Sequence, residues 1–309
     1  MDKVLISGGN GFLRSHLDER AIKEGLDVTI LDDFSTSSRI NVPGEVSIIR
    51  GKVEDISLQN NFEYIFHPAA RPSTEDYITN PVEILMSNSV GTMNLLDMAR
   101  CGKCRFFYAS SWEVYGNAEV LPTPETYYGY VSSWGIRSCY DAGKRYSEAL
   151  TMAYHRKFNI DTRIETLFNV YGLRIRSGRL YGRVIPRFIS QALRNENIVV
   201  HGNGTQTRYV LYFSDWLEAT WKMIKQGDNS REILNIGSPD EILVLSLAEK
   251  IIMITKTSLM IIHLLVRADD PLRRSAGITK AKYVLGWKPK VDLNTGLRNT
   301  IQWMKGENQ

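Results

Sequence analysis

The sequence contains little cysteine and no long apolar run. Its 309 residues include three cysteines, an odd number that does not suit a disulfide framework and indicates a reducing compartment. Cys101 and Cys104 form a CxxC pair, but zinc would need a second pair, so we expect no metal site. No stretch is apolar enough to span a bilayer, and the first residues form a strand-like run instead of a signal peptide. These absences predict a cytoplasmic protein that is not held in a membrane.

The sequence also lacks a strong excess of charge. Its 38 basic and 34 acidic side chains leave a net charge of +4, which is too small to indicate nucleic-acid binding. Hydrophobic and charged contents of 43% and 23% are those of a globular protein, long enough for one large or two modest domains. One basic cluster suits a phosphate-bearing small molecule, although a solvated loop would have the same composition. It comprises Arg174, Arg176, Arg179, Arg183 and Arg187.

A dinucleotide-binding pattern occupies the first residues. The apolar run at 3–7 ends in Gly8, a helical pattern begins just after Gly11, and a second apolar run closes on Asp32. Gly8 permits a tight turn, and Gly11 lets backbone N–H groups approach a pyrophosphate at the helix N-terminus. Asp32 can accept the ribose hydroxyls of NAD, and its charge would repel the additional phosphate of NADP. The pattern therefore predicts an NAD site.

One position departs from this pattern. The third glycine of the motif, which allows close packing of the helix on the strand, is replaced by Arg14. Arg14 must push the helix outward or extend its charged end toward solvent or the phosphates. Weaker cofactor binding is the alternative outcome.

Strands and helices alternate over the first 172 residues. The expected strands cover 3–7, 28–31, 46–49, 64–67, 106–109 and 162–167, and the expected helices cover 12–23, 81–100 and 135–154. This order predicts an α/β fold with a Rossmann-like, doubly wound and mostly parallel sheet, which binds ligands beyond the carboxyl ends of its strands. Five residues follow strands and are expected to meet at that edge: Gly8, Asp32, His67, Ser110 and Asn169.

The regularity falls after residue 172. Helices are expected at 184–193, 215–224, 243–254, 279–285 and 293–304, and short strands at 198–201, 209–213 and 234–237. We expect residues 1–172 to form mainly an NAD-binding domain. Residues 173–309 are expected to form a smaller mixed α/β lobe that binds the substrate, with a segment at about 205–235 returning to the first domain.

A candidate redox centre lies in the helix at 135–154. Tyr140 and Lys144 are four residues apart and therefore share one face of the helix. An ammonium held beside a phenol favours the phenolate, so the tyrosine becomes a usable base. Ser111, from another segment, could hydrogen-bond the oxygen that is oxidised or reduced. The pair alone would be weak, since YxxxK occurs by chance, but here it accompanies a nucleotide-binding pattern.

Taken together, these motifs resemble the extended short-chain dehydrogenase/reductase family of nucleotide-sugar epimerases and dehydratases. Within it the resemblance is greatest to the UDP-glucuronate decarboxylases, because of GIRSCYDAGKR at 135–145 and the glutamate of SSWEVYG at 110–116. Further matching stretches are GGNGFLRSHL (8–17), YITNP (77–81), SNSVGTMNLL (87–96), LFNVYG (167–172), GNGTQTRYVLYFSD (202–215) and LGWKPKV (285–291).

This resemblance implies a reaction on UDP-glucuronate. Tyr140 would take the proton of the sugar 4-hydroxyl while NAD takes hydride from carbon 4. The resulting ketone lies β to the carboxylate, so carbon dioxide can leave, and protonation and hydride return would give UDP-xylose. The catalytic residues implied are Tyr140, Lys144, Ser111, Glu113 and Arg274. Cofactor contacts are implied for Gly8, Gly11, Phe12, Leu13, Asp32, Ala69 and Lys144, and substrate contacts for Asn169, Arg183, Arg208 and Arg274.

The resemblance also implies a homodimer that packs the helices at 81–100 and 135–154 as a four-helix bundle. Apolar residues that allow such a face are Leu95, Met98, Ala149 and Met152.

Two alternatives remain from the sequence. One is a nucleotide-sugar 4,6-dehydratase or 4-epimerase, although Trp112 removes the aspartate that a dehydratase pairs with its glutamate. The other is a relative that binds NAD or a nucleotide sugar but is catalytically impaired. This second alternative follows from Arg14, from Trp112, and from Lys52, which replaces an acid that usually contacts adenine.

Overall fold

The described part of the chain divides into two compact units. The structure, a computed structural model, describes residues 1–8, 11–35, 44, 46–56, 61–68, 72–175, 183–227, 232–265 and 273–307. Unit 1 contains Met1–Gly116, Tyr128–Leu167 and Thr220–Leu234, and unit 2 contains Asn117–Tyr127, Phe168–Ala219 and Asn235–Gln309. None of the helices in these described residues is long and apolar enough to cross a membrane.

A seven-stranded sheet forms the centre of unit 1, with the order β11-β6-β5-β4-β1-β2-β3. The strands are β1 (Lys3–Ser7), β2 (Asp27–Asp32), β3 (Ser47–Arg50), β4 (Tyr64–His67), β5 (Arg105–Ser111), β6 (Thr162–Leu167) and β11 (Ile233–Ile236). Neighbouring strands from β3 to β6 pair in parallel. The predicted Rossmann-like sheet is therefore confirmed.

The strand order reverses between β1 and β4, which pair although β2 and β3 lie between them in the sequence. In an open parallel sheet, the ligand crevice lies at such a reversal, outside the carboxyl ends of the two strands. Gly8 follows β1 and Pro68 follows β4. Both residues therefore lie where the fold predicts a ligand.

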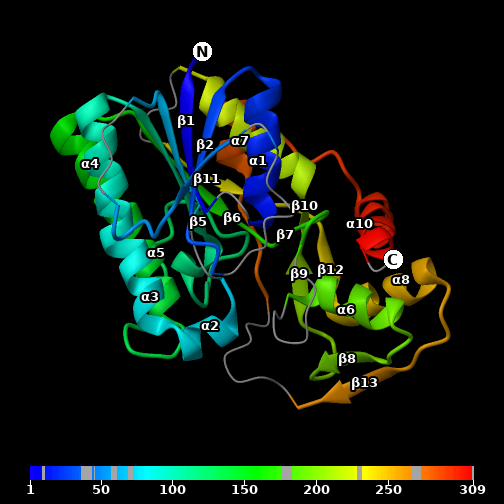
Figure 1. The fold of residues 1–309 in the computed structure, drawn as a ribbon. Coiled ribbons are helices and arrows are strands. Elements are labelled where there is room, and N and C mark those ends of the chain that lie inside the picture. The colour runs from blue at the N-terminus through cyan, green and yellow to red at the C-terminus, as the bar shows by residue number, and fades with distance from the viewer. Residues whose placement is uncertain are drawn as a thin grey trace. The chain divides into compact units, whose positions relative to one another are not determined.

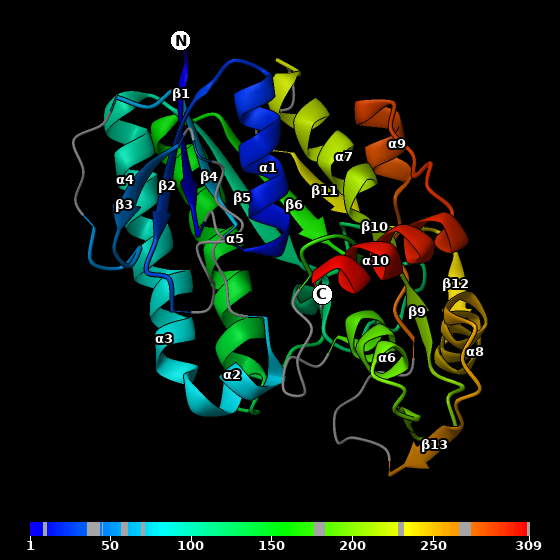
Figure 2. The same cartoon turned by 45° about the vertical axis from the view of Figure 1, so that its right-hand side comes forward.

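Helices cover both faces of this sheet. Helix α1 (Phe12–Lys23) lies along one face, and α3 (Pro81–Met86), α4 (Thr92–Gly102) and α5 (Ser138–Phe158) lie along the other (Figures 1 and 2). The core beneath α4 joins apolar residues of strands and helices, among them Leu5, Ile65, Leu95 and Phe106. Near-continuous apolar strands such as β1 are buried on both sides, as parallel sheets require.

The predicted helix at 81–100 is not continuous. A short helix α2 (Thr74–Thr79) precedes it, and a π-helical turn, η2 (Ser87–Gly91), separates α3 from α4. The Asn88 amide donates to the Ile84 carbonyl at 2.8 Å, and the Thr92 hydroxyl donates to the Asn88 carbonyl at 2.7 Å. These side chains bind the backbone within the wide turn, an effect that apolar periodicity does not reveal.

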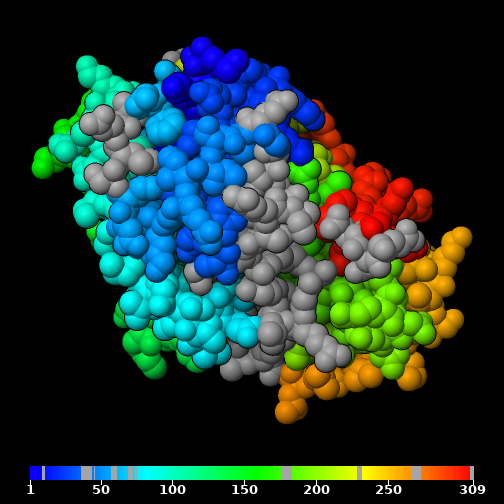
Figure 3. Space-filling view, viewed as in Figure 1, coloured from blue at the N-terminus to red at the C-terminus, as the bar shows by residue number. Residues whose placement is uncertain are grey.

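The prediction of which residues form a dimer face is partly wrong. Leu95 and Met98 are 0% and 5% exposed and belong to the core of unit 1. Met152 packs partly buried against the same core, whereas Ala149 is exposed. The exposed apolar side chains of these helices include Val82, Leu85 and Met86 on α3, in the segment shown in cyan in the space-filling view (Figure 3), with Met93 on α4 and Tyr146 on α5.

Unit 2 consists of short strand pairs and helices. The pairs are β7 (Val170–Tyr171) with β10 (Leu211–Tyr212), β9 (Thr207–Tyr209) with β12 (Glu241–Leu243), and β8 (Ile198–His201) with β13 (Ile261–Leu264). The helices are α6 (Val184–Leu193), α8 (Val244–Thr255), α9 (Thr279–Leu285) and α10 (Leu293–Glu307). The remaining helix, α7 (Phe213–Lys225), begins in unit 2 and ends in unit 1. It begins two residues earlier than expected, and β12 and β13 were not expected.

Candidate cofactor and active site

The glycine turn connects β1 to α1. Gly8 has a φ of +65°, a conformation that side chains disfavour, and its N–H donates to the Leu31 carbonyl at 2.5 Å. Gly11 caps α1, whose first residues are Phe12 and Leu13. Among the described residues, no side chain caps this helix, and its first turn carries no acidic residue. Its N-terminal N–H groups are therefore suited to an anion.

Asp32 lies at the end of β2 and is buried, with 6% of its surface exposed. One carboxylate oxygen accepts the N–H of Phe34 at 2.7 Å. This bond fixes the side chain at the strand end, beside the glycine turn that follows the neighbouring strand β1. Ala69 lies outside the described residues, and Lys52 is exposed beside the buried Val53.

His67, at the end of β4, is a structural residue. Its Nδ1 lies 2.8 Å from the Ser7 hydroxyl and its Nε2 lies 3.1 Å from the Thr92 hydroxyl. Burial, together with the positive charges of Lys144 and Arg14, holds the pKa of His67 well below its usual range. A neutral ring with both nitrogens engaged connects β1, β4 and α4 and does not act as a base.

Arg14 lies across the ligand crevice. Its Nη1 donates to the Gly8 carbonyl and its Nη2 donates to the Pro68 carbonyl, each at 2.7 Å. Burial lowers the pKa of Arg14, and nearby acidic groups, Asp32 first among them, counteract the shift. The sequence left open where this side chain goes, and the structure shows that its charged end turns onto the glycine turn.

The backbone of the glycine turn fits a pyrophosphate, but the Arg14 guanidinium fills the space above it. A Cβ atom built on Gly8 would lie 2.3 Å from Arg14 Nη1, and one built on Gly11 would lie 3.1 Å from the same atom. The absent side chain of Gly11 is what normally lets a pyrophosphate approach, whereas Gly8 permits the tight turn. The turn, the helix N-terminus and Asp32 suit NAD once the guanidinium moves away.

Tyr140 and Lys144 lie on the buried face of α5. Lys144 is 1% exposed, and its Nζ donates to the Ala109 carbonyl at 2.8 Å. The same Nζ lies 5.8 Å from the centre of the Tyr140 ring and 4.7 Å from that of Tyr108. Tyr140 is 5% exposed and stacks on Tyr77 of α2, with the ring centres 5.3 Å apart. The predicted pair is thus held together between the sheet and α2.

Burial changes the acidity of Lys144. Desolvation, assisted by the positive charge of Arg14, lowers the pKa of Lys144 to about 7, while Glu148 opposes the shift. Burial also raises the pKa of Glu148 to about 6. Near neutral pH, Lys144 can therefore gain or lose a proton, as a group that supports proton transfer should.

Ser111 and Glu113 follow at the carboxyl end of β5. Ser111 is the last residue of the strand and caps the 3₁₀ turn at Trp112–Tyr115, and its hydroxyl accepts the N–H of Glu113 at 3.4 Å. The sequence predicted that Ser110 follows the strand, but both serines belong to it. Trp112 is 7% exposed and packs within this turn.

Arg137 is a residue that the sequence analysis missed. Its guanidinium forms an ion pair with the Glu113 carboxylate, and its Nε lies 3.6 Å from Asp141. Although burial opposes the charge, these two carboxylates raise the pKa of Arg137. The available signal was an arginine four residues before Asp141 and three before Tyr140, which shares their helix face.

The residues expected to bind substrate belong to unit 2. Asn169 has a φ of +38°, and its buried side-chain nitrogen has no hydrogen-bond partner among the described residues. Arg208 is 9% exposed and donates to the Thr207 carbonyl at 2.8 Å. Arg183 donates to the Val170 carbonyl at 3.2 Å, and Arg274 is partly buried beside Arg273. Arg176 and Arg179 lie outside the described residues.

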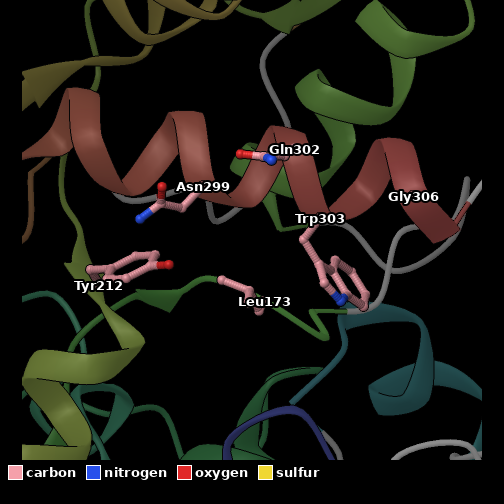
Figure 4. Close-up of a pocket in the computed structure, with 6 residues that line it drawn as sticks. All are labelled: Leu173, Tyr212, Asn299, Gln302, Trp303 and Gly306. Carbon is pink, nitrogen blue, oxygen red and sulfur yellow. The ribbon is translucent and has the colours of Figure 1, made fainter.

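A separate hollow of about 450 Å³ lies in unit 2, on one side of α10 (Figure 4). It is lined by Leu173, Tyr212, Asn299, Gln302, Trp303 and Gly306. None of the residues predicted for catalysis or binding lines it.

The chain is similar to a known protein family and to several of its members. The model of the NAD dependent epimerase/dehydratase family matches residues 4–237. UDP-glucuronic acid decarboxylase 5 of Arabidopsis thaliana is 40% identical over 96% of this chain and 87% of its own length. UDP-glucuronic acid decarboxylase 1 of Danio rerio is 36% identical over 99% of this chain and 73% of its own length.

Solved structures of other proteins have the same fold as this chain. A UDP-glucose 4-epimerase from Thermotoga maritima with UDP-glucose superposes with a TM-score of 0.92 at 26% identity, over 99% of this chain and all of the other. A UDP-glucuronic acid 4-epimerase from Bacillus cereus, in complex with UDP-glucuronic acid and NAD, reaches a TM-score of 0.86 at 26% identity over 99% of each chain.

Proposed function

Because the chain belongs to the NAD-dependent epimerase/dehydratase family, we propose that it is a decarboxylase that converts UDP-glucuronate into UDP-xylose. The observation that carries the proposal is the cluster of Tyr140, Lys144 and the Glu113–Arg137 ion pair in one unit. The decarboxylases named above are 36% and 40% identical to this chain over 99% and 96% of its length.

NAD is the cofactor of this family, and it would supply a reversible hydride acceptor for carbon 4 of the sugar. We propose that unit 1 holds it through the N-terminal N–H groups of α1 and through Asp32. Unit 2 would then hold the UDP moiety, because Asn169, Arg183 and Arg208 supply donors that suit phosphates.

In the proposed mechanism Tyr140 is the base that removes the proton of the 4-hydroxyl. The positive charge of Lys144 favours the phenolate, and Ser111 orients the hydroxyl. The 4-ketone stabilises the charge that remains on carbon 5 when carbon dioxide leaves. Arg274 would face that charge or the carboxylate. Carbon 5 would then take up a proton in place of the lost carboxylate, and Tyr140 would return its proton to the 4-oxygen when the 4-ketone is reduced again.

Arg137 acts as a positioning residue. The ion pair of Arg137 fixes the Glu113 carboxylate at the end of β5. The contact with Asp141 fixes the Arg137 guanidinium itself on α5. The two segments that carry Ser111 and Tyr140 are thereby connected through Glu113 and Arg137.

Mass spectrometry of the sugar nucleotide tests the proposal. Purified protein with NAD and UDP-glucuronate should release carbon dioxide and form a product lighter by that mass. A product of unchanged mass but inverted carbon 4 would identify a 4-epimerase, the activity of the Bacillus cereus neighbour. No turnover with added NAD would favour the catalytically impaired alternative.

We also propose that the protein acts as a homodimer in the cytoplasm. The α3–α5 surface of unit 1 exposes a group of large apolar side chains: Val82, Leu85, Met86, Met93 and Tyr146. Helix α3 packs on α5, so the group forms one surface that a second copy could cover. Cys101, Cys104 and Cys139 form no disulfide with one another, which suits a reducing compartment. Light scattering should give twice the mass of one chain.

A further inference from the structure

The position between β1 and β4 where the fold of unit 1 predicts a ligand crevice is occupied by a side chain of the protein itself. Arg14 reaches from the first turn of α1 into the space between the ends of β1 and β4, where it donates to the carbonyls of Gly8 and Pro68. Its Nη1 lies 2.3 Å from the position that a Cβ atom of Gly8 would take and 3.1 Å from that of Gly11, the glycine that leaves room for a pyrophosphate. The guanidinium therefore lies where a dinucleotide pyrophosphate would approach.

We propose that Arg14 is an internal occupant of the pyrophosphate site, which a dinucleotide must displace, so that NAD binds more weakly than the glycine turn alone would allow. This inference goes beyond the proposed function, because it concerns the affinity for the cofactor whatever the sugar substrate is.

Several contacts hold the guanidinium in place. Both hydrogen bonds are 2.7 Å long, and Gly8 O also accepts the Gly11 N–H at 3.2 Å. The negative charges of Asp32, Asp33 and Asp18 attract the guanidinium. Moving Arg14 out of the crevice removes two short bonds to backbone carbonyls and increases its distance from these acids.

The opposite role, in which Arg14 binds the pyrophosphate, is disfavoured by this position. Both nitrogens that donate are directed at carbonyls on the two walls of the crevice, and the guanidinium lies against the glycines. A pyrophosphate that reaches the N-terminus of α1 needs that same space. The side chain must leave before the phosphates enter, and only the fraction of molecules with an open crevice can bind.

The apparent dissociation constant equals the intrinsic constant divided by the open fraction. If roughly a tenth of the molecules is open, removing the side chain tightens binding about ten-fold. The gain should apply to every ligand that places a pyrophosphate on the turn, and should be absent for adenosine, which has none.

Calorimetric titration of nucleotide-free protein with NAD, ADP-ribose and adenosine tests this. Arg14→Ala should lower the dissociation constants of NAD and ADP-ribose about ten-fold and leave that of adenosine unchanged. Lys23→Ala, which removes the same charge from an exposed position on α1, should change none of them. Arg14→Gln, which keeps most of the stem but not the charge, should shift NAD binding in the same direction and serves if the alanine variant does not fold.

Unchanged or weaker binding of NAD by both Arg14 variants would overturn the proposal, as would an equal gain for adenosine. A protein that binds NAD neither with nor without Arg14 would also overturn it. Because these titrations contain no UDP-glucuronate, their result is independent of whether the protein decarboxylates that sugar.

Discussion

Lys144 shows how one buried side chain can couple the fold to chemistry. The sequence predicts its position four residues after Tyr140, but not its burial or its bond to the Ala109 carbonyl. Burial in a low-dielectric surrounding disfavours the ammonium, and Arg14 adds a second positive charge to that environment. The folded protein therefore holds this lysine at a free-energy cost that depends on pH.

Stability measurements with Lys144→Met should reveal this cost. The pKa of Lys144 is about 7 in the folded protein and about 10.4 in an unfolded chain. Between these values only the unfolded chain binds the proton, so the free energy of unfolding rises with pH by up to about 1.4 kcal/mol per unit. Urea unfolding from about pH 6 to pH 9 should show that the free energy of unfolding of the wild type rises relative to that of the variant above about pH 7. Lys23→Met should give a difference that is independent of pH.

Tyr140→Phe should abolish turnover of UDP-glucuronate while leaving UDP affinity nearly unchanged. The substitution removes only the oxygen that accepts the proton and keeps the ring stacked on Tyr77. Activity and UDP binding are measured on the same preparation. Tyr77→Phe, which keeps the stacking partner, should retain most activity. If Tyr140→Phe turned over UDP-glucuronate at the wild-type rate, Tyr140 would have no part in the mechanism.

Arg137→Gln should lower kcat on the order of a hundred-fold with a smaller change in KM. Without the ion pair, Glu113 loses the group that fixes its position, and small displacements of reacting groups are costly. Arg137→Lys should restore part of the rate because the charge returns. A variant that loses thermal stability but keeps kcat would show that the ion pair serves the fold alone.

At the scale of elements, the interrupted helix of residues 81–102 is set by tertiary contacts. Gly91 lies at the end of the π turn against the branched side chain of Val53, and Gly143 of α5 packs against Asn88. These contacts join segments far apart in the sequence. Periodicity within 81–100 predicts a single helix because it contains no information about them.

Gly91→Ala should destabilise the protein by about 1–3 kcal/mol. An added Cβ would lie 2.4 Å from Val53 Cγ2, and this clash outweighs the gain of at most about 1 kcal/mol in helix propensity. Gly306→Ala in α10 is the control, because nothing lies within 4 Å of its Cβ position. Chemical unfolding should show a loss for the first variant and none for the second.

Whole-molecule features differ in how far the sequence predicted them. The doubly wound sheet followed from alternating apolar runs, and Tyr140, Lys144 and Ser111 followed from spacing and motifs. The position of Arg14 could not be predicted, because it depends on the carbonyls that close the crevice. Arg137 was missed because its partner Glu113 lies on another segment. Leu95 and Met98 were misplaced because the apolar face of a helix does not reveal whether it packs on its own sheet or on a second chain.

The α3–α5 surface leads to a prediction about assembly. Met86, 41% exposed, lies among Val82, Leu85 and Met93 on this surface, and Met86→Lys would bury two unpaired charges per dimer. Burying unpaired charge costs several kcal/mol, and each 1.4 kcal/mol is a ten-fold change in affinity. The dissociation constant of the dimer should therefore increase at least about a hundred-fold. Met253→Lys on α8, where the methionine is 66% exposed, should leave the mass unchanged. Light scattering over a dilution series separates the two, and a Met86→Lys protein that stays dimeric would place the interface elsewhere.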